Sequence, residues 1–141
     1  CEEEFGVDES IASFVLPLLE SDLLTIMMAT SEGRLSEVLV KFSDKSACCV
    51  IIASKGYPVK YESGYPLALP ADGEDGVIYV AGAKRTEAGL VSAGGRVLGV
   101  TATADTLREA VDAAYAKAAK VRFDNGFYRK DIGARALAAK E

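Results

Sequence analysis

The chain has 141 residues, of which 50% are apolar and 26% are charged, and its net charge is −5. This length suits one domain with its own core, and the composition is that of a soluble globular protein. An acidic chain without a clustered Lys/Arg stripe is not a typical nucleic-acid-binding protein. The longest apolar run, at 47–53, is too short to span a bilayer. We therefore expect neither nucleic acid nor a membrane among the partners.

Histidine is absent, and the three cysteines are Cys1, Cys48 and Cys49. The absence of histidine excludes a Ser-His-Asp triad, a Cys-His dyad and histidine-ligated zinc, so only an oxygen-ligated Mg²⁺ or Ca²⁺ remains open. Adjacent cysteines on a strand face opposite sides, which disfavours a disulfide and indicates a reducing compartment, the cytoplasm. We expect both side chains to be buried as small apolar groups.

The first half of the chain predicts helices followed by a buried strand. Apolar residues recur at helical spacing over 10–30, with Pro17 marking a kink or a first turn and Gly33 ending the helix. A short second helix is predicted over 35–42. The β-branched run at 46–55 reads as a central strand. The proline- and glycine-rich segment 56–76 is predicted to be a loop.

The second half predicts short antiparallel strands and one helix. Strands are expected over 76–84, 89–92 and 96–104. Thr106 and Glu109 form a capping box, which indicates that a helix begins there with an apolar face for the sheet and a charged opposite face. The expected fold class is therefore α+β.

Two short motifs could bind an anion. Ala93-Gly94-Gly95-Arg96 is either a two-residue hairpin, whose central positions require positive φ, or a phosphate cradle in which the guanidinium supplies a bidentate fork. ASKGYP at 53–58 ends the buried strand with a lysine and a turn; the lysine is either a functional group presented at the end of the strand or a solvated side chain before the turn. The acidic stretch DGEDG at 72–76 lacks the spacing of a calcium loop and is expected to be a solvated tip.

Five collinear segments resemble the phosphoribosylamine–glycine ligase family, an ATP-grasp family of purine biosynthesis. They are VLPLLESDLL (15–24), ASKGYP (53–58), AGGRVLGVTA (93–102), DTLREAVDAAY (105–115) and FYRKDIGARAL (127–137). Residues 1–45 then correspond to the end of an ATP-grasp region, mostly helical, and residues 46–141 to the C-terminal domain. The resemblance implies N-terminal helices, then a small antiparallel β-meander or barrel-like sheet with a C-terminal helix packed on it.

The resemblance also implies a function. The complete ligase joins glycine to 5-phosphoribosylamine through glycyl phosphate, with ATP and Mg²⁺ bound mainly by parts outside this chain, so the chain alone is expected to be inactive. No catalytic residue is assigned, because no residue looks like a general base and an amine that attacks an acyl phosphate hardly needs one. No metal ligand is assigned, because the segment at 2–9 departs from the family's metal-binding pattern. The alternative is a non-catalytic module that packs against an ATP-grasp core. The residues expected to bind the sugar phosphate are Gly94, Gly95, Arg96, Lys55, Gly56 and Tyr57.

Overall fold

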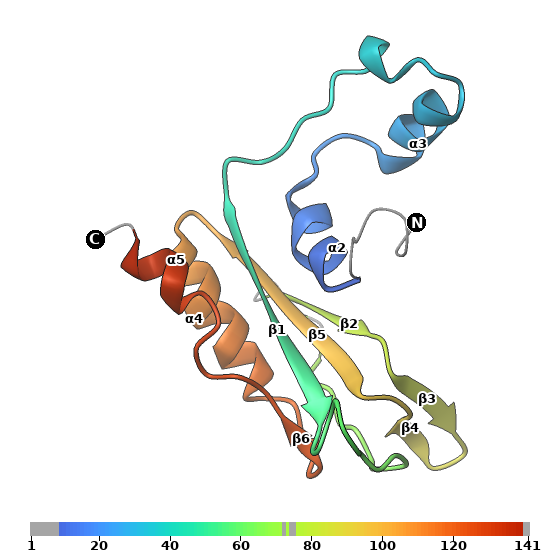
Figure 1. Cartoon of the computed structure of the whole chain (residues 1–141), viewed down its shortest axis with the longest axis vertical. Helices are drawn as coiled ribbons and strands as arrows, with labels where there is room; N and C mark the ends of the chain where they lie inside the picture. Colours follow the sequence, from blue (N-terminus) through green and yellow to red (C-terminus); the bar gives the residue numbers. More distant parts are fainter. Residues whose placement is uncertain (1–8, 72, 74–75, 140–141) are drawn as a thin grey trace.

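The computed structural model describes residues 9–71, 73 and 76–139, and it has an α+β fold with antiparallel sheets, as the sequence predicts. Figure 1 shows helices at the N-terminal end, the strands at the centre and the long helix α4 beside them. The elements are α2 (Glu9–Val15), η1 (Leu16–Leu18), α3 (Leu23–Ser31), η2 (Leu35–Glu37), β1 (Ser46–Ser54), β2 (Val77–Val80), β3 (Ala83–Thr86), β4 (Gly89–Ser92), β5 (Arg96–Ala104), α4 (Leu107–Ala118), β6 (Gly126–Phe127) and α5 (Ala134–Ala138).

The main sheet is four-stranded, in the order β2-β5-β1-β6, and all its neighbours are antiparallel. The long pairing of β1 with β5 runs in register from Ser46 opposite Ala104 to Ile52 opposite Leu98, and it shifts before Ala53 pairs with Arg96. Because opposed residues of an antiparallel pair share a face, this register places Val50, Ile52 and their partners on one face and Ile51 with Gly99 on the other.

Helix α4 covers the first face and closes the hydrophobic core. Its residues Ala110, Val111, Ala114 and Ala118 are buried against the strands, and alanine allows the helix to approach the sheet closely. The predicted capping box is confirmed: Glu109 N–H donates to Thr106 Oγ1 at 3.3 Å and Thr106 N–H donates to Glu109 Oε2 at 3.1 Å. The apolar face that the sequence predicts for this helix is the face that packs against the sheet.

Helix α2 lies against the opposite face of the same sheet (Figure 1). The hydroxyl of Thr101 donates to the carbonyl of Ser13 at 2.8 Å, which ties α2 to the middle of β5. A Cβ built on Gly99 would approach Ser13 Oγ at 3.8 Å, so the helix passes directly over this part of the strand.

The predicted helix over 10–30 is interrupted. Pro17 lies in the short 3-10 helix η1, and the chain then runs extended, with Leu19 opposite Phe42. A new helix begins when the Asp22 side chain accepts a hydrogen bond from Thr25 N–H at 2.7 Å. This cap lowers the pKa of the Asp22 carboxyl. The sequence predicted a kink or a first turn at Pro17. It did not predict the extended stretch between Pro17 and Leu23, because the apolar spacing continues across it.

The predicted helix over 35–42 is wrong beyond its first turn. Only Leu35–Glu37 form a turn of 3-10 helix, Val38 is extended, and the residues up to Phe42 are not helical. The reason lies in the partner segment, since Glu20 N–H donates to the carbonyl of Lys41 and Ser43 N–H donates to the carbonyl of Leu18. These tertiary bonds replace the helical ones.

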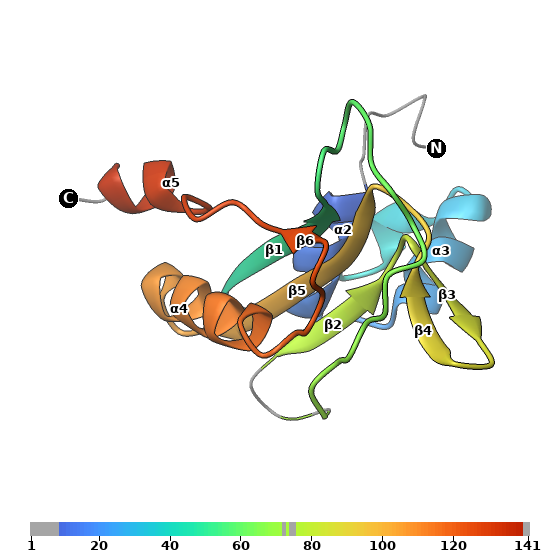
Figure 2. The ribbon, with the colours of Figure 1, turned by 90° about the horizontal axis from the view of Figure 1, so that it is seen from below.

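Residues 76–84 form two strands rather than one. β2 pairs with β5, whereas β3 pairs with β4 in a separate two-stranded sheet, which Figure 2 shows beside β2. The chain changes sheets at Gly82, where Gly82 N–H donates to the carbonyl of Arg96 and the Gly82 carbonyl accepts from Ala93 N–H. The sequence pattern does not reveal this change because apolar residues continue through it.

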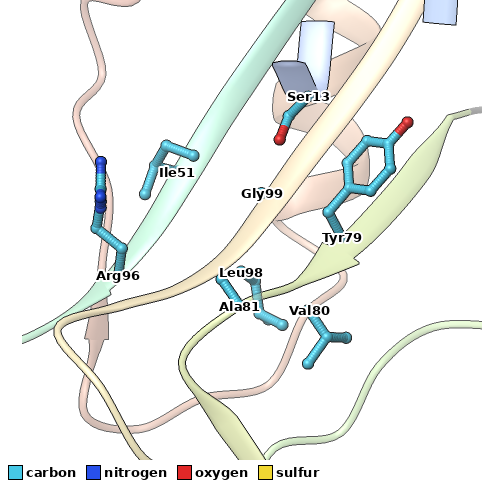
Figure 3. Close-up of a pocket in the computed structure, with 8 residues that line it drawn as sticks. All are labelled: Ser13, Ile51, Tyr79, Val80, Ala81, Arg96, Leu98 and Gly99. Carbon is cyan, nitrogen blue, oxygen red and sulfur yellow. The ribbon is translucent and has the colours of Figure 1, made fainter. Parts of the chain in front are cut away.

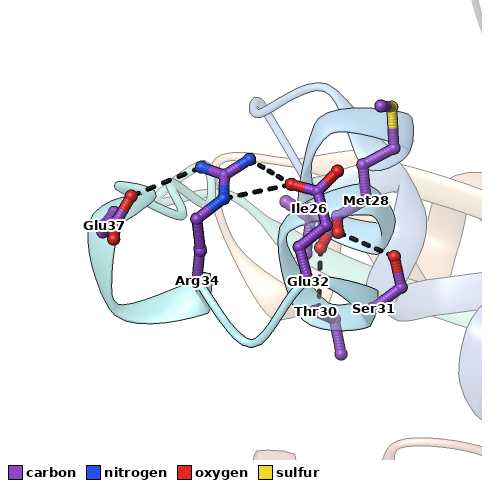
Figure 4. A network of polar contacts seen from close by, with 7 residues as sticks. All are labelled: Ile26, Met28, Thr30, Ser31, Glu32, Arg34 and Glu37. Carbon is purple, nitrogen blue, oxygen red and sulfur yellow. Dashed lines mark hydrogen bonds and ion pairs between the residues drawn. The ribbon is translucent and has the colours of Figure 1, made fainter.

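Residues 16–42 form an arm that carries a large exposed apolar surface. In Figure 1, α3 stands away from the sheet, and Ala29 is its one buried residue. The end of α3 is held by local polar contacts, with Arg34 between Glu32 and Glu37 (Figure 4). Such exposed ion pairs contribute little stability. The exposed apolar side chains of the arm are Leu16, Leu23, Leu24, Met27, Met28, Leu35, Leu39, Val40 and Phe42.

The remaining predictions concern the cysteines, the loop and the termini. Cys48 is buried, Cys49 is half-buried, and both are free thiols on opposite faces of β1. Most of 56–76 is loop, as predicted, although Asp72, Glu74 and Asp75 lie outside the described residues, as does the segment 1–8. Within the described part of the chain, no helix is long and apolar enough to cross a bilayer.

Candidate functional site

The two candidate anion-binding motifs meet where β1 ends and β5 begins. Ser54, the last residue of β1, is fully buried and bonds both glycines of the second motif. Its N–H donates to the carbonyl of Gly95 at 2.8 Å, and its hydroxyl donates to the carbonyl of Gly94 at 2.9 Å. Ser54 therefore ties the segment 53–58 directly to the segment 93–96, although the two are distant in the sequence.

The hairpin interpretation of Gly94-Gly95 is wrong. β4 and β5 do not pair with each other, and neither glycine has a positive φ. The glycines are instead required by close packing. A Cβ on Gly94 would lie 3.0 Å from Gly82 Cα, and a Cβ on Gly95 would lie 2.1 Å from Cδ2 of the Tyr57 ring. The turn that begins at Lys55 thus places an aromatic ring directly over the second motif.

Lys55 and Gly56 set the shape of that turn. Lys55 N–H donates to the carbonyl of Asn125 at 2.8 Å, and the Lys55 ammonium donates to the carbonyl of Asp124 at 3.2 Å. Its charge is therefore held toward the segment that leads into β6, whereas Arg96 belongs to β5, on the other side of β1. Gly56 has a φ of +88° and accepts from Val59 and Lys60, which explains the glycine.

Arg96 lines a cavity of about 110 Å³ on the face of the sheet that α2 covers. Figure 3 shows the Arg96 side chain beside Ile51, the Tyr79 ring across β5, and Ser13 above Gly99. Most of the residues that line the cavity are apolar, and Arg96, Ser13 and Tyr79 are the lining residues with polar side chains. The full lining is Ser13, Ile51, Tyr79, Val80, Ala81, Arg96, Leu98 and Gly99.

Burial disfavours the charged forms of two groups around the cavity. It raises the pKa of the Tyr79 hydroxyl above its ordinary value of 10.0, so this hydroxyl, already protonated at neutral pH, remains a hydrogen-bond donor to higher pH. Burial likewise raises the pKa of the Cys49 thiol, which adjoins Gly99. The Arg96 guanidinium is the permanent charge among the lining residues. These properties suit binding of a small anionic ligand better than nucleophilic chemistry.

Sequence reasoning missed three residues of this region. Ser54 directly precedes Lys55, and a serine at the end of a buried strand could have indicated that its hydroxyl needs a hydrogen-bond partner in the fold. Gly82 permits the close approach of the chain to Gly94, and its signal was an interior glycine in a predicted strand. Tyr79 had no distinguishing signal, because its position on the cavity face follows from the register of β2 with β5.

The described residues offer no ready metal site. Over 9–71, 73 and 76–139, no three His, Cys, Asp or Glu side chains come together in a group that could hold an ion. We therefore assign no metal ligand among these residues.

Comparison with known proteins places these features in a family. The family model described as "Phosphoribosylglycinamide synthetase, C domain" matches residues 47–135. The phosphoribosylamine–glycine ligase of Rhizobium meliloti is 48% identical over 85% of this chain and 29% of that relative. The ligases of Caldanaerobacter subterraneus and Halalkalibacterium halodurans are 41% and 42% identical, over 92% and 96% of this chain.

A solved structure shows the same fold. The crystal structure of phosphoribosylamine–glycine ligase from Thermotoga maritima superposes with a TM-score of 0.75 at 32% identity, covering 84% of this chain and 29% of that one. The chain spans 29–31% of the length of these curated relatives. The family match covers most of the chain, including both candidate motifs and the capped helix α4. This chain belongs to the phosphoribosylglycinamide synthetase C-domain family.

Proposed function

We propose that this chain is the C-terminal part of an ATP-dependent ligase that joins glycine to 5-phosphoribosylamine in purine biosynthesis in the cytoplasm. In this reaction ATP phosphorylates the glycine carboxylate, giving glycyl phosphate and ADP. The amine of phosphoribosylamine then attacks the acyl carbon, and phosphate leaves as glycinamide ribonucleotide forms. The observation that carries the proposal is the 41–48% identity to relatives named phosphoribosylamine–glycine ligase over most of this chain.

The part of the reaction that we assign to this chain is binding of the sugar phosphate. Arg96 supplies the charge, because its guanidinium can donate two hydrogen bonds to one phosphate. The carbonyls of Gly94 and Gly95 are engaged by Ser54, so these glycines contribute chiefly the shape of the site. We propose that the turn Lys55-Gly56-Tyr57 forms the neighbouring wall. Holding the remote phosphate positions the reactive amine for attack.

The exposed apolar arm supports assignment of residues 1–45 to the end of an ATP-grasp region. Met27 and Leu39 are 60% and 74% exposed, and a soluble protein rarely leaves so many large apolar side chains uncovered on one segment. We infer that the rest of the ligase covers the arm. ATP and Mg²⁺ are then bound mainly by those parts, where the metal would neutralise the charge that develops on the transferred phosphate.

The first experiment is a ligase assay on the complete protein that contains these residues. ADP release that requires both glycine and phosphoribosylamine, with formation of glycinamide ribonucleotide, supports the proposal. The alternative of a non-catalytic module predicts that the complete protein folds and remains inactive in this assay. The sequence encoded upstream of Cys1 separates the two independently, since the ligase requires an ATP-grasp region there.

A second experiment tests the role of Arg96 in the same protein. Losing a charge-assisted hydrogen bond costs about 1.5–3 kcal/mol, so Arg96→Ala should lower kcat/KM for phosphoribosylamine about ten- to hundredfold with little change for ATP or glycine. Arg96→Lys should recover part of the loss, because a point charge cannot replace the fork. Arg85→Ala, an exposed arginine on β3, is the matched control. Equal losses for all three substrates would contradict this role.

A further inference from the structure

Ser54 is a fully buried serine whose hydrogen bonds all go to the two candidate motifs. Besides donating to the carbonyls of Gly94 and Gly95, it accepts at its own carbonyl from Tyr57 N–H at 3.1 Å. One residue therefore fixes the peptide group that follows each glycine, and it also fixes the turn that places the Tyr57 ring over them.

A pair of adjacent glycines, such as the pair at 94–95, does not hold one conformation by itself. Glycine occupies more of backbone space than any other residue, so the pair alone would leave the direction of Arg96 poorly defined. Gly82 bonds the two ends of the segment: its carbonyl accepts from Ala93 N–H at 2.7 Å, and its N–H donates to the carbonyl of Arg96 at 3.0 Å. The middle of the segment is held by Ser54.

The bonds to Ser54 also determine where the other side of each peptide group points. In a trans peptide the C=O and the N–H point in opposite directions. Both carbonyls of the glycine pair point to Ser54, so the N–H groups of Gly95 and Arg96 point away from it. Regular strand pairing does not reach this point unbroken, because the register of β1 with β5 shifts between Ile52 and Ala53. Ser54 thus sets the direction in which Arg96 enters β5.

We propose that Ser54 is a positioning residue that acts through Arg96. The inference rests on the proposed function, in which Arg96 binds the substrate phosphate, and it adds a residue that does not touch the substrate. Ser54 is fully buried, so it has no surface with which to contact a ligand. It holds the glycine pair in the binding conformation before the substrate arrives, so that binding does not require the two glycines to become ordered.

Ser92 offers a matched control, because it is likewise a fully buried serine at the end of a strand. Its hydroxyl accepts from Tyr65 N–H at 3.2 Å, so this side chain bonds the loop rather than the glycine pair. Ser54→Ala and Ser92→Ala each remove one buried hydroxyl hydrogen bond, and both should lower the urea midpoint. A purely structural role of Ser54 therefore predicts that the two variants behave alike in the ligase assay.

The test is a set of variants in the complete ligase. Ser54→Ala should raise KM for phosphoribosylamine about tenfold, with kcat and KM for ATP and glycine within about twofold, whereas Ser92→Ala should change each constant by less than about twofold. Because Ser54 acts through Arg96, adding Ser54→Ala to Arg96→Ala should raise KM no further. Ser54→Cys, which keeps a similar size and a weak donor, should lie between the wild type and Ser54→Ala, and it carries the test if Ser54→Ala does not fold.

Binding of ribose 5-phosphate gives a readout that is independent of turnover. The wild type should bind this probe, and Ser54→Ala should bind it about tenfold more weakly at a temperature at which both are folded. Equal effects of Ser54→Ala and Ser92→Ala on KM, or a further loss when Ser54→Ala is added to Arg96→Ala, would overturn the inference. If the wild type forms no glycinamide ribonucleotide, the proposed function fails, and probe binding then decides the role of Ser54. A wild type that neither turns over nor binds the probe overturns both.

Discussion

Replacing Gly95 by alanine tests how the two motifs are packed together. The added Cβ would lie 2.1 Å from Cδ2 and 2.5 Å from Cε2 of the Tyr57 ring. Carbon atoms pack at about 3.5–4.0 Å, so the ring must move by about 1.5 Å. Overpacking of this kind costs about 1–3 kcal/mol, and we expect Gly95→Ala to lower the free energy of unfolding by about 2 kcal/mol. Movement of the ring would also disturb its contact with Tyr61, whose ring centroid lies 5.9 Å away.

The assay is urea unfolding of four proteins: the wild type, Gly95→Ala, Tyr57→Ala and the double variant. If the Tyr57 ring causes the cost, Gly95→Ala should be nearly neutral once the ring has been removed. The coupling free energy of this cycle should then equal most of the cost of the single Gly95 change. Additive effects, with no coupling between the two positions, would refute the packing that we describe. An unchanged midpoint for Gly95→Ala alone would refute it as well.

Three further predictions concern stability. Thr106→Ala removes the side-chain cap of α4 and should cost about 1 kcal/mol, seen as a lower denaturant midpoint. Lys117 is buried and donates to the carbonyl of Gly76 at 2.7 Å, so Lys117→Met, which leaves that carbonyl without this donor, should cost about 1–3 kcal/mol by the same assay. Burial raises the pKa of the Cys48 thiol from 9.0 to about 11, because it disfavours the thiolate. The folded chain therefore holds this proton to higher pH than the unfolded chain. The contribution of Cys48 to stability should be constant below about pH 9 and fall toward pH 11, so Cys48→Ala should give a flatter profile over this range.

Local sequence determined the elements that can be recognised from composition, from a helix cap or from the spacing of apolar residues. The bounds of β5 and the buried run of β1 follow from β-branched and apolar composition, and α4 follows from its cap and its apolar stripe. These features depend on contacts within a few residues or on burial that the composition alone predicts. The collinear motifs likewise indicated the family, because their order and spacing are written in the chain.

Only the tertiary structure decided which strands pair, in which register they pair, and where one element ends and the next begins. The apolar spacing continues through residues 16–22 and through residues 80–83, so the pattern does not show that an element ends in either segment. In the first segment Glu20 N–H donates to the carbonyl of Lys41, and in the second Gly82 N–H donates to the carbonyl of Arg96. The packing of Tyr57 over Gly95 and the cavity above Gly99 arise from the register of β1 with β5 and of β2 with β5. Register joins residues that are distant in sequence, and a shift of one residue would turn each side chain to the other face. For this reason the two candidate motifs could be found in the sequence, whereas the contacts between them could not.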